Sequence, residues 1–199
     1  EIQRGSSQEI DAVLCLFDLK EFTQLSERLP GNEMIDMLNG YFGLVVEVIQ
    51  AHGGNILKFM GDGMLTMFNL GSIEEDAHAA LAAANELCGK VRAHNRAREA
   101  QGLPTAGFTL ALHAGDILYG NIGAENRLDF TVIGPAVNQT ARIAGMHRSV
   151  GQNIIMSQDV QKAAQGTDHD MVSLGRYMLR GVADPIELYT IYRGDCSCP

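Results

Sequence analysis

The chain has 199 residues, a length that one hydrophobic core can support, so the sequence predicts a single globular unit. Hydrophobic residues make up 46% of the chain, and no apolar run approaches the ~18 residues that a membrane-spanning helix needs. The net charge of -9, from 24 acidic and 15 basic residues, argues against nucleic acid as a partner.

The chain begins at Glu1, and no signal segment follows it. We therefore expect a soluble, cytoplasmic domain cut from a longer protein, which could itself be attached to a membrane and which carries an upstream regulatory domain. In this division residues 1–10 are the remnant of a linker, residues 11–193 are the domain, and residues 194–199 are a C-terminal tail.

The four cysteines suggest neither a metal site nor a disulfide framework. Cys15 falls in an apolar strand and Cys88 on a helix, while Cys196 and Cys198 form a terminal Cys-x-Cys pair. This spacing is not that of a zinc ligand set. We expect reduced thiols and a frayed tail, as is usual in the cytosol.

The first predicted strand covers residues 11–17, a short apolar run rich in β-forming side chains that ends at Asp18. A long amphipathic helix is predicted over residues 33–50, because apolar side chains recur there every three or four positions. Asn32 is the candidate N-cap of this helix, and Gly53 is its stop signal.

A β-hairpin is predicted next. Two apolar runs, 56–60 and 64–68, flank Gly61, Asp62 and Gly63. The glycines permit the positive φ angles that a tight turn needs, which places Asp62 at the tip of the hairpin.

A second amphipathic helix is predicted over residues 77–91. Ser72 and Glu75 form a capping box in front of it. The polar segment that follows, residues 94–104, is expected to project as an arm or loop.

The next segments return to a β pattern. Residues 108–115 alternate between apolar and polar, and the pattern continues through 117–123 and 127–134. Pro135 then opens a helix that reaches Ala144, since proline is tolerated at the first helical position. The remaining predicted elements are a strand at 153–156, a helix after Ser157 and a β region over 172–192.

The order strand, helix, hairpin, helix, strand is typical of the α+β class, and it predicts a ferredoxin-like sheet with helices on one face. His113 falls within the alternating strand, and we interpret it as a core histidine in preference to a catalytic base.

Two aspartates are candidates for binding a metal ion. Asp18 ends a buried strand just before a helix start, where helical N–H groups can hold phosphate oxygens and a carboxylate can bind a hard cation. Asp62 lies on a hairpin that can pair with that strand, so the two carboxylates can converge. Paired metals support an in-line phosphoryl displacement. Taken singly, an aspartate at the position of Asp18 is more often only a helix cap, and Asp62 could be an ordinary turn residue.

Asn138 and Arg142 are four residues apart on the helix that Pro135 opens, so they share one face. A fork-shaped guanidinium suits a transition state that spreads charge over phosphate oxygens, and the amide can orient a sugar. A solvated helix face with an ordinary arginine is the alternative interpretation. No residue stands out as a dedicated general base.

Three segments together resemble successive motifs of the class III adenylyl and guanylyl cyclase catalytic domains. They read DLKEFT, KFMGDG and TVIGPAVNQTAR, in that order. The segment LHAGDILYGNIGAENRLDFT resembles the strand pair that precedes the last motif. The resemblance runs from about Asp11 to Tyr192, and the combination is far more specific than any one motif.

The resemblance implies an adenylate cyclase that makes 3′,5′-cyclic AMP and pyrophosphate from ATP with two metal ions, Mg²⁺ or Mn²⁺, at each site. Asp18 and Asp62 would be the metal ligands, with the backbone carbonyl of Leu19. Phe22 and Thr23 would offer backbone N–H groups to the triphosphate.

The remaining roles also follow from the resemblance. Lys58 matches the purine-selecting lysine of adenylyl cyclases, Asn138 and Arg142 match the transition-state pair, and Arg180 matches a basic residue on the terminal phosphates. In this family the groups that complete a site come from a partner subunit, so the resemblance implies a homodimer with two shared sites.

Thr131 separates subgroups of the family. Many adenylyl cyclases carry Asp at this position, and a threonine hydroxyl can still serve the adenine amino group because it both donates and accepts. Threonine here resembles the subgroup that is often associated with bicarbonate stimulation.

Three other interpretations stay open. A guanylate cyclase would commonly carry Glu in place of Lys58. A catalytically silent regulatory partner would typically lack a metal aspartate or the arginine, and both are present here. A binding module of the same fold would have no metal-dependent nucleotide site.

Overall fold

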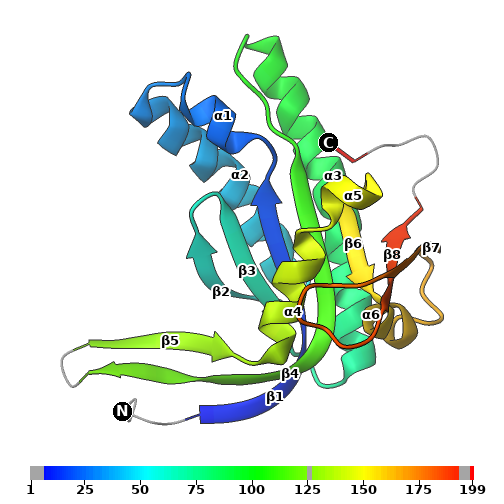
Figure 1. Ribbon diagram of the computed structural model, residues 1–199. Coiled ribbons are helices and arrows are strands. Elements are labelled where there is room, and N and C mark those ends of the chain that lie inside the picture. The colour runs from blue at the N-terminus through cyan, green and yellow to red at the C-terminus, as the bar shows by residue number, and fades with distance from the viewer. Residues whose placement is uncertain (1–6, 125–126, 193–197) are drawn as a thin grey trace.

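The computed structural model of the chain describes residues 7–124, 127–192 and 198–199 (Figure 1). One mixed sheet has the strand order β2-β3-β1-β4-β6-β8-β7, and β5 pairs with β4 beside this path. The strands are β1 (Ser7–Leu19), β2 (Asn55–Met60), β3 (Gly63–Phe68), β4 (Phe108–Ala124), β5 (Arg127–Ile133), β6 (Ile154–Ser157), β7 (Met171–Tyr177) and β8 (Ile186–Ile191). The helices are α1 (Phe22–Ser26), α2 (Gly31–Ala51), α3 (Ile73–Ala100), α4 (Pro135–Ala144), α5 (His147–Val150) and α6 (Gln158–Ala163).

The predicted α+β class is confirmed, but the helices cover both faces of the sheet. Cys15 and Phe17 of β1 point into the core beneath α2 and α3, whereas Ala12 and Leu14 pack with Ala136 of α4. In Figure 1, α4 lies in front of the sheet and α3 behind it. The expectation of helices on one face is therefore wrong for α4. The physical reason is that β1 is apolar on both faces, so each face needs a cover.

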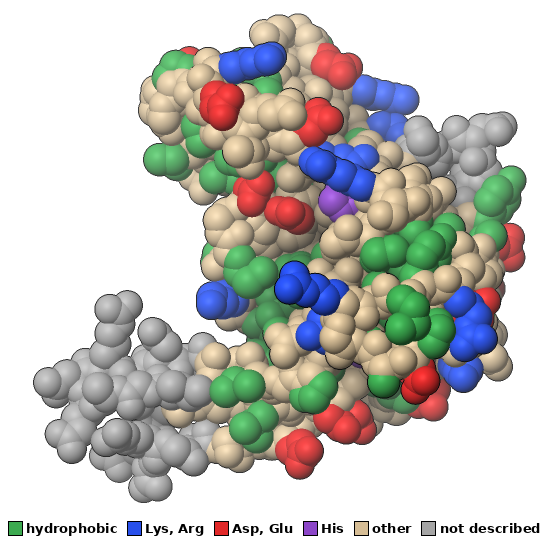
Figure 2. All heavy atoms as spheres, viewed as in Figure 1, with side chains coloured by type: hydrophobic (Ala, Val, Ile, Leu, Met, Phe, Trp, Pro, Cys, Tyr) green, Lys and Arg blue, Asp and Glu red, His purple; other side chains and the backbone are tan. Residues whose placement is uncertain are grey.

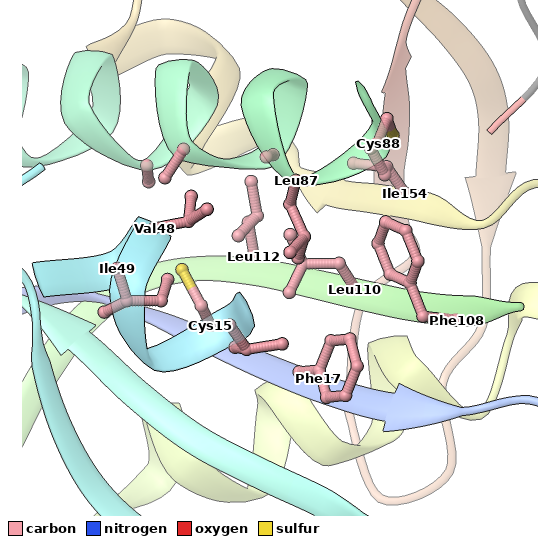
Figure 3. Close-up of a cluster of buried hydrophobic side chains, with 14 of the residues drawn as sticks. Cys15, Phe17, Val48, Ile49, Leu87, Cys88, Phe108, Leu110, Leu112 and Ile154 are labelled. Carbon is pink, nitrogen blue, oxygen red and sulfur yellow. The ribbon is translucent and has the colours of Figure 1, made fainter. Parts of the chain in front are cut away.

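The larger core lies between the sheet and the two long helices. Figure 3 shows Cys15 and Leu112 of the sheet facing Val48 of α2 and Leu87 of α3. Each of these side chains is at most 1% exposed. Truncating a buried leucine of this kind to alanine typically costs about 2–5 kcal/mol, so this core fixes the sheet that carries the site.

The N-cap expected for the first long helix is wrong, although its end is confirmed. Helix α2 begins at Gly31, so its N-cap position falls on Pro30 and Asn32 lies inside the helix. Pro30 makes no side-chain cap, because proline has no polar side-chain group. At the other end, Gly53 takes a φ of 81° just beyond the helix, as a glycine stop signal does.

The capping box at the start of α3 is confirmed on its serine side. The hydroxyl oxygen of Ser72 accepts a hydrogen bond from the Glu75 amide at 3.2 Å.

The arm expected over 94–104 is wrong, since α3 continues to Ala100. Asn95 explains the extension, because its side-chain amide donates to the Ala106 carbonyl at 2.8 Å and its oxygen accepts from the Tyr41 hydroxyl at 2.6 Å.

Strand β1 is longer than predicted. It begins at Ser7, inside the segment expected to be a linker, and pairs there with Gly120 of β4. The predicted hairpin 56–68 is confirmed as β2 and β3, and Pro135 occupies the first turn of α4 as predicted. Strands β4 and β5 form a hairpin that reaches away from the rest of the sheet in Figure 1.

The expectation of reduced thiols is wrong for two cysteines. Cys88 of α3 and Cys198 form a disulfide across 110 positions of sequence. The expected frayed tail is also wrong at its described end, because the Asn153 side-chain amide donates to the Cys198 carbonyl at 2.8 Å. Cys15 is a buried free thiol, as expected, and Cys196 lies outside the described residues.

Cys198→Ser should lower the free energy of unfolding by about 2–4 kcal/mol in non-reducing buffer, because the long loop that the disulfide closes constrains the unfolded chain. The measurement is a urea denaturation midpoint. Cys196→Ser is the matched control and should leave the midpoint unchanged. In buffer with excess dithiol, wild type and Cys198→Ser should converge; equal midpoints without reductant would contradict the role of the disulfide.

Candidate functional site

Asp18 and Asp62 come together at one end of the sheet. Asp18 of β1 pairs with Gly63, the first residue of β3, and the Leu19 amide donates to the Asp62 carbonyl at 3.2 Å. A Cβ added at Gly63 would lie 2.8 Å from the Phe17 carbonyl oxygen and 3.3 Å from a carboxylate oxygen of Asp18. Only glycine allows the hairpin to approach β1 this closely, and the approach brings the two carboxyl groups into hydrogen-bond contact.

The surroundings of Asp18 raise its pKa to about 6, although part of the side chain reaches solvent. Burial is the largest cause, followed by repulsion from the Asp62 carboxylate and the hydrogen bond between the two carboxyl groups. His147 and a backbone hydrogen bond from Leu19 act in the opposite direction. Two acidic groups held this close favour a proton or a cation between them.

A pocket of about 350 Å³ surrounds the pair. One wall comes from the strands that carry the aspartates, and the other comes from the C-terminal half of α4 and the residues after it. His147 is in this second wall, and its Nδ1 lies 2.9 Å from the Ala144 carbonyl oxygen. The lining residues are Leu16, Phe17, Asp18, Met60, Asp62, Gly63, Thr109, Ala141, Ala144, Gly145 and His147.

The donor set suits a hard cation that also binds a ligand. Carboxylate oxygens are what Mg²⁺ prefers, and proteins commonly hold it by one or two carboxylates, with substrate phosphates and water completing the shell. Within residues 7–124, 127–192 and 198–199, no group of three His, Cys, Asp or Glu side chains comes together as a metal site. A cation here would therefore need oxygen ligands beyond Asp18 and Asp62.

Phe22 and Thr23 begin the short helix α1 directly after the aspartate strand. The amides of Gln24 and Leu25 donate to the Glu21 carbonyl at 3.1 and 3.2 Å, so the two preceding amides come before the first helical hydrogen bonds. The Phe22 side chain is 6% exposed and anchors the helix in the core.

Arg142 lies outside the aspartate pocket. Helix α4 packs on the sheet through Ala136 and Ile143, and Arg142 is exposed. A Cβ added at Gly181 would lie 3.1 Å from a terminal nitrogen of Arg142, so the guanidinium rests on the loop between β7 and β8. Arg180 is in the same loop. The structure thus brings the two predicted phosphate-binding arginines to one place, away from Asp18 and Asp62.

Lys58 of β2, Thr131 of β5 and Asn138 of α4 are three further predicted site residues. None of the three lines the aspartate pocket. The structure therefore does not bring them together with Asp18 and Asp62 of the same chain.

His147 is the pocket residue that sequence analysis missed. Nothing marks it in the sequence except its position three residues past the end of α4. His113 is confirmed as a core histidine, since it is 8% exposed and its Nδ1 lies 2.8 Å from the Ser157 hydroxyl.

Acidic and basic side chains lie next to one another on the surface around the aspartate pocket (Figure 2). Figure 2 shows acidic side chains and a histidine gathered between α1 and α4, with Lys and Arg side chains on either side of them.

Of the helices in the described part of the chain, none combines the length and the apolar character that a membrane span needs.

Residues 6–193 match the family model described as the adenylate and guanylate cyclase catalytic domain. Adenylate cyclase 1 of Rhizobium meliloti is 32% identical over 189 residues, which are 92% of this chain and 27% of that protein. The chain spans about a third of the length of the curated relatives it matches.

Two solved structures extend the comparison. The guanylyl cyclase Cya2 has a TM-score of 0.83 at 31% identity, covering 97% of this chain and 99% of its own. The adenylyl cyclase CyaB from P. aeruginosa has a TM-score of 0.86 at 24% identity, covering 95% and 97%, and this likeness shows the fold.

Proposed function

Because the chain belongs to the adenylate and guanylate cyclase catalytic domain family, we propose that it is an adenylate cyclase, which converts ATP to 3′,5′-cyclic AMP and pyrophosphate. The contact between the carboxyl groups of Asp18 and Asp62, in a pocket open to a ligand, carries the cyclase assignment. Lys58 favours ATP, since it matches the purine-selecting lysine of adenylyl cyclases.

The metal proposal rests on the same two carboxylates. Their oxygens fit two divalent ions, Mg²⁺ or Mn²⁺, with the Leu19 carbonyl as a further ligand, and the raised pKa of Asp18 fits a site built to receive positive charge. When bound, the ions would supply positive charge to the reacting phosphates and the leaving group.

In the proposed reaction the ribose 3′-oxygen forms a bond to the α-phosphorus, the bond to the β-phosphate oxygen breaks, and the hydroxyl proton leaves to solvent. The Phe22 and Thr23 amides hold the triphosphate. Asn138 orients the ribose, and the fixed charge of Arg142 stabilises the five-coordinate phosphorus. Arg180 binds the terminal phosphates.

We assign these residues to two chains of a homodimer. Arg142 rests against Gly181 and does not line the pocket of its own Asp18 and Asp62, which supports a site that takes aspartates from one chain and Asn138 and Arg142 from the other. A twofold dimer then holds two equivalent shared sites.

A guanylate cyclase is the second candidate function. The observation that favours it is the guanylyl cyclase Cya2, which is similar over nearly the whole chain. A silent regulatory partner is the third, although the full set of aspartates and the arginine argues against it. The test is turnover of ATP and GTP with Mg²⁺ or Mn²⁺ at several protein concentrations. GTP turnover above ATP turnover supports the second candidate, and no turnover at any dimer-forming concentration supports the third.

Lys58→Glu should reduce the ratio of ATP turnover to GTP turnover by about tenfold or more, because a donor to the adenine edge becomes an acceptor. The measurement is kcat/KM for each nucleotide. Lys162→Glu, on α6, is the charge-matched control and should keep the wild-type ratio. An unchanged ratio in Lys58→Glu would remove this lysine from base recognition.

Thr131 extends the proposal to bicarbonate as a candidate activator. The hydroxyl lies on β5 opposite Gly120 of β4, beside the position proposed for the adenine. We expect a higher rate with bicarbonate than with chloride at the same pH and ionic strength. Equal rates would exclude this regulation.

We also propose that this chain is one domain of a longer protein. The chain spans about a third of its curated relatives, which supports an upstream regulatory domain in the full protein. We propose a cytoplasmic catalytic domain that covers the predicted residues 11–193, followed by a tail at 194–199. Because β1 begins at Ser7 and pairs with β4, the domain includes residues 7–10 as well.

A further inference from the structure

A second pocket of about 270 Å³ adjoins the aspartate pocket, and His147 lines both. Lys20 and Glu21, from the turn between β1 and α1, form one side of it. His147 and Arg148, the first residues of α5, form the other. The pocket thus continues the aspartate site toward a group of basic side chains on the same chain. Its remaining lining residues are Gly151 and Asn153.

Two basic side chains line this second pocket, Lys20 and Arg148. Among the described residues, neither Lys20 nor Arg148 makes an ion pair. The Asn153 amide is already used, since it donates to the carbonyls of Cys198 and Pro199. The Nδ1 of His147 donates to the Ala144 carbonyl, so the Nε2 of the neutral ring is an acceptor and does not hold a phosphate oxygen. Lys20 and Arg148 are therefore the donors that the pocket offers to an anion.

The backbone holds Lys20 and Glu21 in place. The Lys20 amide donates to the Gly107 carbonyl at 2.8 Å. Glu21 has a φ of 57°, the only positive φ of a non-glycine residue within the described ranges. This left-handed conformation is uncommon for glutamate and turns the chain sharply from β1 into α1. The turn fixes Lys20 and Glu21 beside the aspartate pocket.

We propose that Lys20 and Arg148 bind the polyphosphate end of the nucleotide and the pyrophosphate that leaves, on the same chain as Asp18 and Asp62. The inference rests on the proposed function. A phosphate held at the aspartates needs its distal oxygens neutralised, and this pocket places a guanidinium and an ammonium next to them. It adds a binding site separate from Arg180, which lies in the loop beside Arg142 and does not line this pocket.

Substitution of Glu21 should change the affinity for pyrophosphate in the opposite direction to substitution of Lys20 or Arg148. Its carboxylate lines the pocket and opposes the binding of an anion, whereas Lys20 and Arg148 favour it. Removing the negative charge should therefore strengthen pyrophosphate binding, and removing either positive charge should weaken it. A general loss of folding would not give opposite signs.

The test is the dissociation constant of Mg²⁺-pyrophosphate, measured by calorimetry on the whole chain without nucleotide. Arg148→Ala should weaken binding by about tenfold and Lys20→Ala by a few-fold, since charge-assisted hydrogen bonds to phosphate are lost. Glu21→Gln should tighten binding about threefold. Arg176→Ala, on the edge strand β7, is the matched control and should bind as wild type does.

Turnover of ATP separates this inference from the proposed function. If Arg148→Ala and Lys20→Ala bind pyrophosphate as tightly as wild type while wild type turns over ATP, the pocket assignment is wrong and the cyclase assignment stands. If the variants shift pyrophosphate affinity as expected but wild type makes no cyclic nucleotide, the pocket stands and the cyclase assignment fails.

Discussion

Asp18→Asn should lose nearly all cyclase turnover and yet unfold at a higher temperature than wild type when no metal is present. The loss of turnover should exceed about a hundredfold, because the amide keeps the size of the side chain but removes the charge that holds a divalent ion. The gain in stability follows from the raised pKa of Asp18, about 6 against the ordinary 3.8.

The sign of this stability change follows from proton binding. Between pH 3.8 and about 6 the folded chain keeps the Asp18 proton that the unfolded chain releases, so stability falls as the pH rises through that range. At pH 7.5 Asp18 is ionised in the folded chain, and its unpaired negative charge lowers the free energy of unfolding by the full amount. Because part of the side chain reaches solvent, we expect removal of that charge to add on the order of 1 kcal/mol, or about 2–4 °C.

Thermal unfolding at pH 7.5 and pH 4, with and without Mg²⁺, measures this effect. The advantage of Asp18→Asn should shrink at pH 4, where wild type is protonated, and added Mg²⁺ should stabilise wild type alone. Asp36→Asn, an exposed position on α2, is the matched control and should change neither turnover nor unfolding. An Asp18→Asn chain that is less stable than wild type would indicate a structural role for this carboxylate instead of a site for a cation.

An equimolar mixture of Asp18→Ala and Arg142→Ala should recover about a quarter of wild-type activity, although each variant alone is nearly inactive. In a shared-site dimer, each homodimer lacks one essential group at both sites. A mixed dimer has one site with both defects and one site with none. If chains exchange randomly, half of the dimers are mixed and half of their sites are intact, which gives roughly a quarter.

The structure supplies a matched control for this experiment. Asp18 and Asp62 line the same pocket of one chain, whereas Arg142 lies against Gly181 outside it. A mixture of Asp18→Ala with Asp62→Ala should therefore stay inactive, because every site still lacks one aspartate. Cyclic AMP production is measured after chain exchange has been verified with differently labelled chains. No recovery in the first mixture would place the whole site in one chain.

The sequence by itself determined the local elements and the meeting of the two aspartates. The apolar run before Asp18, the glycines around Asp62 and the proline at 135 each act within a few residues, and the structure shows the strand, hairpin and helix start they predict. Once β1 and the hairpin pair, Gly63 lies opposite Asp18, so the carboxylates meet. The roles proposed for Lys58, Thr131, Asn138, Arg142 and Arg180 remain predictions.

The tertiary structure alone decided the features that depend on packing between distant segments. The Cys88–Cys198 disulfide joins residues 110 positions apart, and no spacing rule reveals such a pair. Helix α4 covers the second face of the sheet because β1 is apolar on both sides, and this packing turns Arg142 toward Gly181 and brings His147 beside Asp18. Periodicity within a segment reports which side of an element is apolar, but only the assembled sheet determines which distant side chains share that side.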